Sequence, residues 1–133
     1  MDKIMSLDHP DIIKALELVP VEWVEPQYQT PCGLFRTKDG WHRCFKNQVG
    51  DWANGYSPVD EFQAAALMEK CWTPYLVSAG CEITYWEEVA VSCIMAILIP
   101  GRPPGDRYRS ARTMDDVPLA LARAIIAVKG EKE

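Results

Sequence analysis

The architecture of this chain is set by Val89-Ala-Val-Ser-Cys-Ile-Met-Ala-Ile-Leu-Ile-Pro100, the most hydrophobic run of its 133 residues. Both alternating sets of side chains in this run are largely apolar. A strand that is apolar on both faces is typical of a central strand covered on both sides. We therefore expect a central strand between two layers, and the run has about half the length that a membrane-spanning helix needs.

Two β-hairpins are predicted around this centre. Residues 81–86 precede the apolar run, and a tight turn at Glu87-Glu88 joins the two as antiparallel strands. Earlier in the chain, Lys38-Asp39-Gly40 separates two short runs rich in aromatic residues, 34–36 and 41–45. Turn residues between alternating apolar runs are typical of a hairpin.

Three helices are predicted from their start and stop signals. The first begins at Asp8-His9-Pro10-Asp11, continues with an apolar stripe at helical spacing, and ends at Pro20. The second is expected from Pro58 to about Trp72, with Ser57 as its cap. It directs Phe62, Ala65, Ala66 and Met68 to one face. The third is expected over 117–128, capped by residues 113–116.

The order of these elements predicts an α+β domain. An antiparallel sheet of about four strands, with helices on both faces, would form an α/β/α three-layer sandwich. The length fits one domain over residues 1–133. Its parts are an N-terminal helix (1–20), an aromatic-rich hairpin and loop (21–57), and a unit of helix, strand pair, arginine loop and last helix (58–130).

Composition limits the possible classes of function. The chain carries a net charge of −5, and an acidic protein is a poor candidate for general nucleic-acid binding. Its five cysteines form no regular framework, which favours reduced thiols. The N-terminus lacks the apolar region of a secretory signal. We therefore expect a cytoplasmic protein that does not associate with membranes.

Several segments resemble the phage ABA sandwich domain, a family of small proteins from tailed phages and prophages. The resemblance covers about residues 50 to 130. It rests on Tyr56-Ser57 before a helix with Ala64-Ala65-Ala66, on Pro100-Gly101 after the strand pair, and on Pro118-Leu119-Ala120-Leu121-Ala122-Arg123-Ala124. It implies a three-layer fold and an accessory role in the cytosol of a bacterial host. It implies no catalytic residues, and the long arginine loop departs from the family pattern.

The strongest candidate site is the arginine loop over residues 100–112. It holds four of the seven arginines and one acid, Asp106. Guanidinium groups bind phosphate in a bidentate manner, whereas Asp115 and Asp116 in the next helix start would repel an anion. An anionic ligand, a contact with another protein chain, for example a neighbouring subunit, and a solvated surface remain open. The candidate ligand-binding residues here are Arg102, Arg107, Tyr108, Arg109 and Arg112.

Aromatic residues in the first hairpin region are the second candidate. Trp41, Trp52 and Tyr56 lie near glycines and polar residues, where a ring is available for stacking on a ligand. The alternative is a small satellite core beneath a long loop.

Metal binding and catalysis have little support in the sequence. Cys32, His42 and Cys44 form the one ligand-like cluster, but they lack paired zinc spacings and a fourth ligand. A Cys44–His42 pair is the single candidate for nucleophilic chemistry, and no nucleophile motif is present. We expect no metal, no cofactor and no enzymatic activity.

These observations lead to three hypotheses about function. The first is a non-enzymatic phage protein that counters host defence by sequestering an anionic, nucleotide-like signal, at a site shared within a homo-oligomer. The second is an inhibitor that binds a host defence protein directly, for example as a nucleic-acid mimic. The third is a hydrolase that degrades the same signal.

Overall fold

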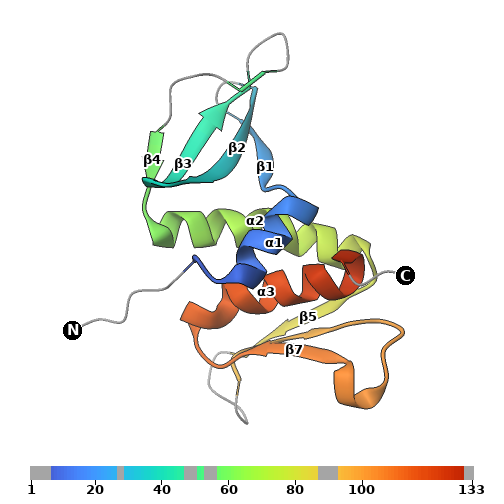
Figure 1. The fold of residues 1–133 in the computed structure, drawn as a ribbon. Helices are drawn as coiled ribbons and strands as arrows, with labels where there is room; N and C mark the ends of the chain where they lie inside the picture. Colours follow the sequence, from blue (N-terminus) through green and yellow to red (C-terminus); the bar gives the residue numbers. More distant parts are fainter. Residues whose placement is uncertain (1–6, 27–28, 47–50, 53–56, 87–92, 131–133) are drawn as a thin grey trace, which may run out of the picture.

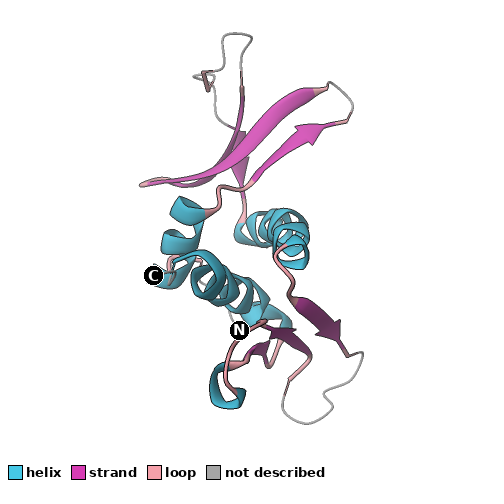
Figure 2. Ribbon diagram, turned by 90° about the vertical axis from the view of Figure 1, so that its right-hand side faces the viewer, coloured by secondary structure: helices cyan, strands magenta, loops and turns pink. Residues whose placement is uncertain are grey.

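Three helices lie as a layer between two antiparallel sheets (Figures 1 and 2). This computed structural model describes residues 7–26, 29–46, 51–52, 57–86 and 93–130. The helices are α1 (Pro10–Leu18), α2 (Glu61–Ser78) and α3 (Val117–Ile125). The first sheet has the order β1 (Glu22–Glu25), β2 (Thr30–Thr37), β3 (Gly40–Phe45), β4 (Ser57–Val59), and the second β5 (Glu82–Tyr85), β6 (Met95–Leu98), β7 (Tyr108–Ala111).

The predicted α+β class is confirmed, and the predicted layering is not. The strands form two separate sheets rather than one, and the helices lie between them (Figures 1 and 2). Helix α3 contacts β6 and β7 on one side and packs beside α1 and α2. The hydrophobic core therefore centres on the helical layer.

The first hairpin agrees with its prediction. Strands β2 and β3 pair from Cys32 opposite Phe45 to Thr37 opposite Gly40. Gly40 has a φ of 131°, a conformation that residues with a side chain rarely adopt. Two strands that the sequence did not reveal, β1 and β4, extend this sheet at its edges.

Helix α2 begins three residues later and ends six residues later than predicted. Asp60, not Ser57, is its cap: its carboxylate accepts a bond of 2.8 Å from Gln63 N, and the Gln63 side chain accepts from Asp60 N. Because this capping box starts the helix after Asp60, Ser57–Val59 are outside the helix and pair with β3 as an edge strand. Proline is tolerated in an edge strand, which accommodates Pro58. Pro74 lies inside the helix without ending it.

The buried face of α2 also differs from the expectation. Its buried side chains are Ala64, Ala65, Met68, Trp72 and Leu76. Phe62 is 58% exposed and Ala66 is exposed as well, so the four residues predicted to share one face do not share one environment. Trp72 is fully buried, and its indole N–H donates to the carbonyl of Val19, just after α1, at 2.8 Å.

The apolar run supplies the central strand β6, but a helical layer covers only one of its faces. Met95 and Ile97 are fully buried toward the helices, whereas Ala96 and Leu98 on the other face are half-buried. Tyr85 pairs with Met95. The turn predicted at Glu87-Glu88 lies outside the described residues. The expectation of two covering layers is therefore wrong for the described chain.

The last helix begins at its predicted residue, although neither Thr113 nor Asp116 makes the expected side-chain capping bond. A short 3-10 turn, Met114–Asp116, leads into α3, and the helical path continues over Ile126–Gly130. Helix α3 is buried almost all round, as its apolar residues indicated. Helix α1 starts where expected, although His9 rather than Asp8 caps it, through its Nδ1. Within the described residues, no helix combines the length and apolarity needed to cross a membrane.

Candidate functional site

The arginine segment is folded around Asp106. Arg102 and Arg109 both pair with its carboxylate, and the Arg109 Nη2–Asp106 Oδ1 distance is 3.1 Å. Arg102 also donates to the carbonyl of Ala127 at 2.8 Å, and Arg109 to the carbonyl of Asp106 at 2.9 Å. Two of the four arginines therefore hold the segment in shape, and part of it is the edge strand β7 rather than a loop.

The ion pairs at Asp106 predict a specific acid sensitivity. Hydrogen bonding from Arg102 is the main cause that lowers the pKa of Asp106. A lowered carboxyl pKa stabilises the fold above the unfolded pKa of about 3.9, and this stabilisation is lost as the pH falls through the folded value. We expect Asp106→Asn to lower the melting temperature at neutral pH and to show a smaller further loss below about pH 4. Circular dichroism melts over pH, with Asp39→Asn as the exposed control, measure this. Parallel pH profiles for Asp106→Asn and wild type would contradict it.

The remaining residues of the arginine segment face solvent to different degrees. Arg107 is half-buried, and Arg112 and Tyr108 are exposed. Neither Arg107 nor Arg112 forms an ion pair with a described residue. Among the described residues, Arg107 and Arg112 are therefore the two arginines of this segment whose positive charges no carboxylate neutralises.

The structure does not bring the predicted aromatic residues to the arginines. Trp41 is 4% exposed and belongs to the core. Trp52 packs edge-on against Phe35 with ring centroids 4.9 Å apart, and Lys46 lies over its ring. Both tryptophans belong to the β1–β4 side, across the helical layer from β7 (Figure 1). Tyr56 lies outside the described residues. One chain therefore does not assemble the seven described candidates into one site, because Trp41 and Trp52 lie apart from the five residues of the arginine segment.

The two thiols of the predicted cluster, Cys32 and Cys44, are free and buried in the described structure. His42 Nδ1 lies 3.1 Å from Thr37 Oγ1. Burial raises the pKa of the thiols of Cys32 and Cys44, which favours the protonated, unreactive form. Among the described residues, no group of three or more His, Cys, Asp or Glu is arranged to hold a metal ion.

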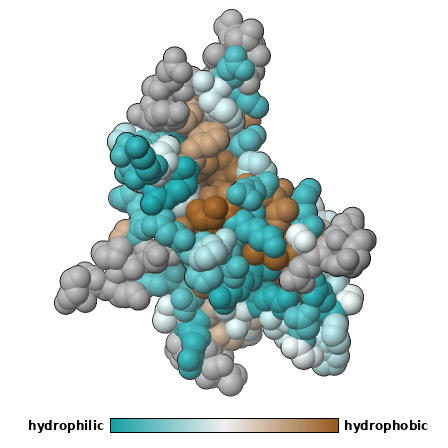
Figure 3. Space-filling view, viewed as in Figure 1, coloured by the Kyte–Doolittle hydropathy of each residue, from teal (hydrophilic) through white to brown (hydrophobic). Residues whose placement is uncertain are grey.

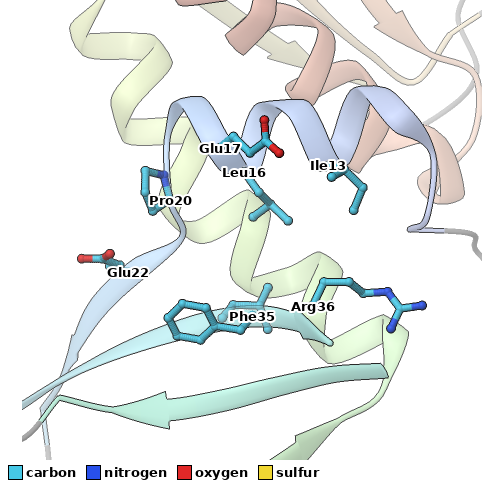
Figure 4. A pocket seen from close by; sticks show the side chains of 8 residues that line it. Ile13, Leu16, Glu17, Pro20, Glu22, Phe35 and Arg36 are labelled. Carbon is cyan, nitrogen blue, oxygen red and sulfur yellow. The ribbon is translucent and has the colours of Figure 1, made fainter. Parts of the chain in front are cut away.

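An open apolar groove lies between α1 and β2. The groove has a volume of about 430 Å³. The side chains of Ile13 and Leu16 point into it from α1 toward β2 (Figure 4). Apolar side chains gather at the same place in the space-filling view, between the β1–β4 sheet and the helices (Figure 3). Its lining residues are Ile13, Leu16, Glu17, Pro20, Glu22, Leu34, Phe35 and Arg36.

The charges of this groove are distributed unevenly. Arg36, at one end, is paired with Asp8 at 2.8 Å and lies over the ring of Trp41. Glu22 lies toward the other end, and Glu17 projects from α1 (Figure 4). Neither of these glutamates forms an ion pair with a described residue. The groove therefore has an apolar floor, and two carboxylates that no described cation neutralises lie at its rim (Figure 4).

The sequence contained one signal for this groove. Ile12, Ile13 and Leu16 make the apolar stripe of the first helix wider than a single buried contact needs. Ile12 is buried against the core, whereas Ile13 and Leu16 are only half-buried. The other wall comes from β2, and its position beside α1 was not predictable from local patterns.

A second exposed apolar surface runs along α2. Phe62 and Val77 are 58% and 55% exposed, and Ala66 and Thr73 lie between them on the same helical stripe. Hollows on either side of Ala66 are flanked by Met114 and by Tyr85, whose hydroxyl donates to Glu69. An outward helix face is normally polar, so this stripe is unusual.

Comparison with known proteins gives no relative: no family model, no curated protein and no solved structure matches the chain. The resemblance to the phage ABA sandwich domain therefore stays a prediction.

Proposed function

We propose that this chain is a non-enzymatic binding protein that accepts a segment of a partner protein in the α1–β2 groove. The observation that carries this proposal is the open apolar groove with two carboxylates that are unpaired among the described residues. Concave apolar surfaces with a few polar groups are the usual form of a binding site.

The chemistry of the groove defines the partner segment. Ile13 and Leu16 would take apolar side chains at helical or extended spacing. Glu17 and Glu22 would pair with lysine or arginine, since Arg36 is already neutralised by Asp8. The expected partner segment is therefore amphipathic and basic. With the phage origin predicted from the sequence, a host defence protein is the natural source of such a segment.

Selection from a displayed random-peptide library tests this function. We expect the wild-type chain to enrich peptides that combine apolar and basic residues. Glu17→Lys/Glu22→Lys is expected to weaken the binding of these peptides about tenfold or more, because two attractive pairs become repulsive. Glu82→Lys/Asp115→Lys changes the net charge equally at a distance from the groove and is expected to leave the affinity unchanged. Equal loss in both variants, or enrichment of acidic peptides, would refute the proposal.

A second candidate is the sequestration of an anionic, nucleotide-like ligand. It is favoured by one observation: Arg107 directly precedes the exposed Tyr108, Arg112 follows the end of β7, and neither arginine has an ion-pair partner among the described residues. Calorimetry with mono-, di- and cyclic nucleotides should detect binding that Arg107→Ala/Arg112→Ala lowers at least about tenfold. Lys14→Ala/Lys38→Ala, which removes two exposed cations elsewhere, is the matched control. Nucleotide binding that both variants retain would exclude these arginines.

A further inference from the structure

The exposed stripe of α2 has a two-fold pattern. About the midpoint between Glu69 and Lys70, the apolar Phe62 mirrors Val77, and the small Ala66 mirrors Thr73. The two residues on either side of this midpoint are an acid, Glu69, and a base, Lys70. These residues form two rows at i, i+4 spacing, Phe62–Ala66–Lys70 and Glu69–Thr73–Val77, which the symmetry exchanges.

We propose that two copies of this chain form a dimer through antiparallel pairing of α2 with α2 of the second copy. In this arrangement Phe62 of each copy meets Val77 of the other, at both ends of the contact. Ala66 and Thr73 meet near the centre, where their small side chains let the helices approach closely. A two-fold interface places the same patch on both copies, and this stripe is complementary to itself.

The charges of the stripe favour a second copy of this chain as its partner. Glu69 of each copy would face Lys70 of the other, which gives two symmetric ion pairs at the centre. Lys70 is exposed and pairs with no described acid within its own chain. The other residues of the stripe, Phe62, Ala66, Thr73 and Val77, are uncharged. Asp115 is the one further charged residue that lines the hollow beside Phe62 and Ala66 in the described chain.

The surroundings of the stripe enlarge the contact. Met114 and Tyr85 are 61% and 46% exposed, and they flank the hollows on either side of Ala66. The 18 residues of α2 give a helix about 27 Å long. Clustered exposed apolar residues of this kind mark an interaction surface. The stripe is separate from the α1–β2 groove, so the dimer does not depend on the proposed function.

Sedimentation equilibrium of the purified full chain tests the dimer over about 1 to 100 μM protein. We expect the mass to rise toward twice the 15.0 kDa of the chain. Ala66→Arg, which places a long charged side chain at the centre, is expected to leave a monomer. Ser78→Arg lies on the same helix outside the stripe and is expected to dimerise like the wild type. Circular dichroism confirms that each variant is folded.

Exchanging the charges of Glu69 and Lys70 tests whether these two residues pair across the proposed dimer. Glu69→Lys and Lys70→Glu each make two like-charged pairs and should weaken the dimer about tenfold. Mixing these two variants should restore association as a heterodimer, and so should Glu69→Lys/Lys70→Glu in one chain. A monomer at every concentration would overturn the proposal. A dimer that is insensitive to Ala66→Arg and to both charge changes would overturn it as well.

Discussion

Trp72→Ala is expected to lower the free energy of unfolding by about 3–5 kcal/mol, among the largest losses that a single core substitution produces. The indole is fully buried on the inner face of α2. Its removal leaves a cavity between the helices, and the carbonyl of Val19 loses its donor at 2.8 Å. That carbonyl lies just after α1, so the side chain links two members of the helical layer.

Urea unfolding followed by circular dichroism measures this loss. Trp72→Phe should cost less, because it keeps most of the packing and removes only the indole hydrogen bond and part of the volume. Trp86→Ala is the matched control, since that side chain is 40% exposed and its loss should cost under about 1 kcal/mol. Equal costs for Trp72→Ala and Trp86→Ala would contradict the burial of Trp72 in the core.

Ile97→Ala is expected to cost about 2–4 kcal/mol, and Leu98→Ala less than about 1.5 kcal/mol. The two residues are neighbours on β6 and point to opposite faces of the sheet. Ile97 is fully buried beneath the helical layer, whereas Leu98 is half-buried on the other face. The difference therefore measures how unequally the two faces of the central strand are covered.

The same unfolding experiment decides between one and two covering layers. The sequence predicts two layers, because both faces of the strand are apolar. That arrangement would make the two substitutions equally costly. Nearly equal losses at Ile97 and Leu98 would therefore contradict the single covering layer of β6 and support a strand buried on both faces.

Local patterns predicted most of the helices and strands. The turn at Lys38-Asp39-Gly40 and the burial of α3 followed from turn residues and apolar periodicity. The start of α2 was mistaken because both Ser57 and Asp60 are good caps. Only Asp60 has Gln63 three residues later to complete the reciprocal bonds. Pro58 was then free to lie in an edge strand.

The layering was not predictable from local patterns. Whether two hairpins share one sheet depends on contacts between segments distant in the sequence, and periodicity does not report these. The α1–β2 groove depends on the same long-range placement. In the arginine segment, the positions of the charged residues were visible in the sequence. That Asp106 pairs with both Arg102 and Arg109 depends on how the segment folds.

The sharpest test of the groove as the binding site is a methyl-resolved NMR titration of the wild-type chain with a peptide selected from the displayed library. We expect the methyl resonances of Ile13, Leu16 and Leu34 to shift as the peptide is added, while those of Val77 and Met114 on the α2 side stay in place. Shifts confined to Val77 and Met114, with Ile13 and Leu16 unchanged, would rule out the groove as the binding site.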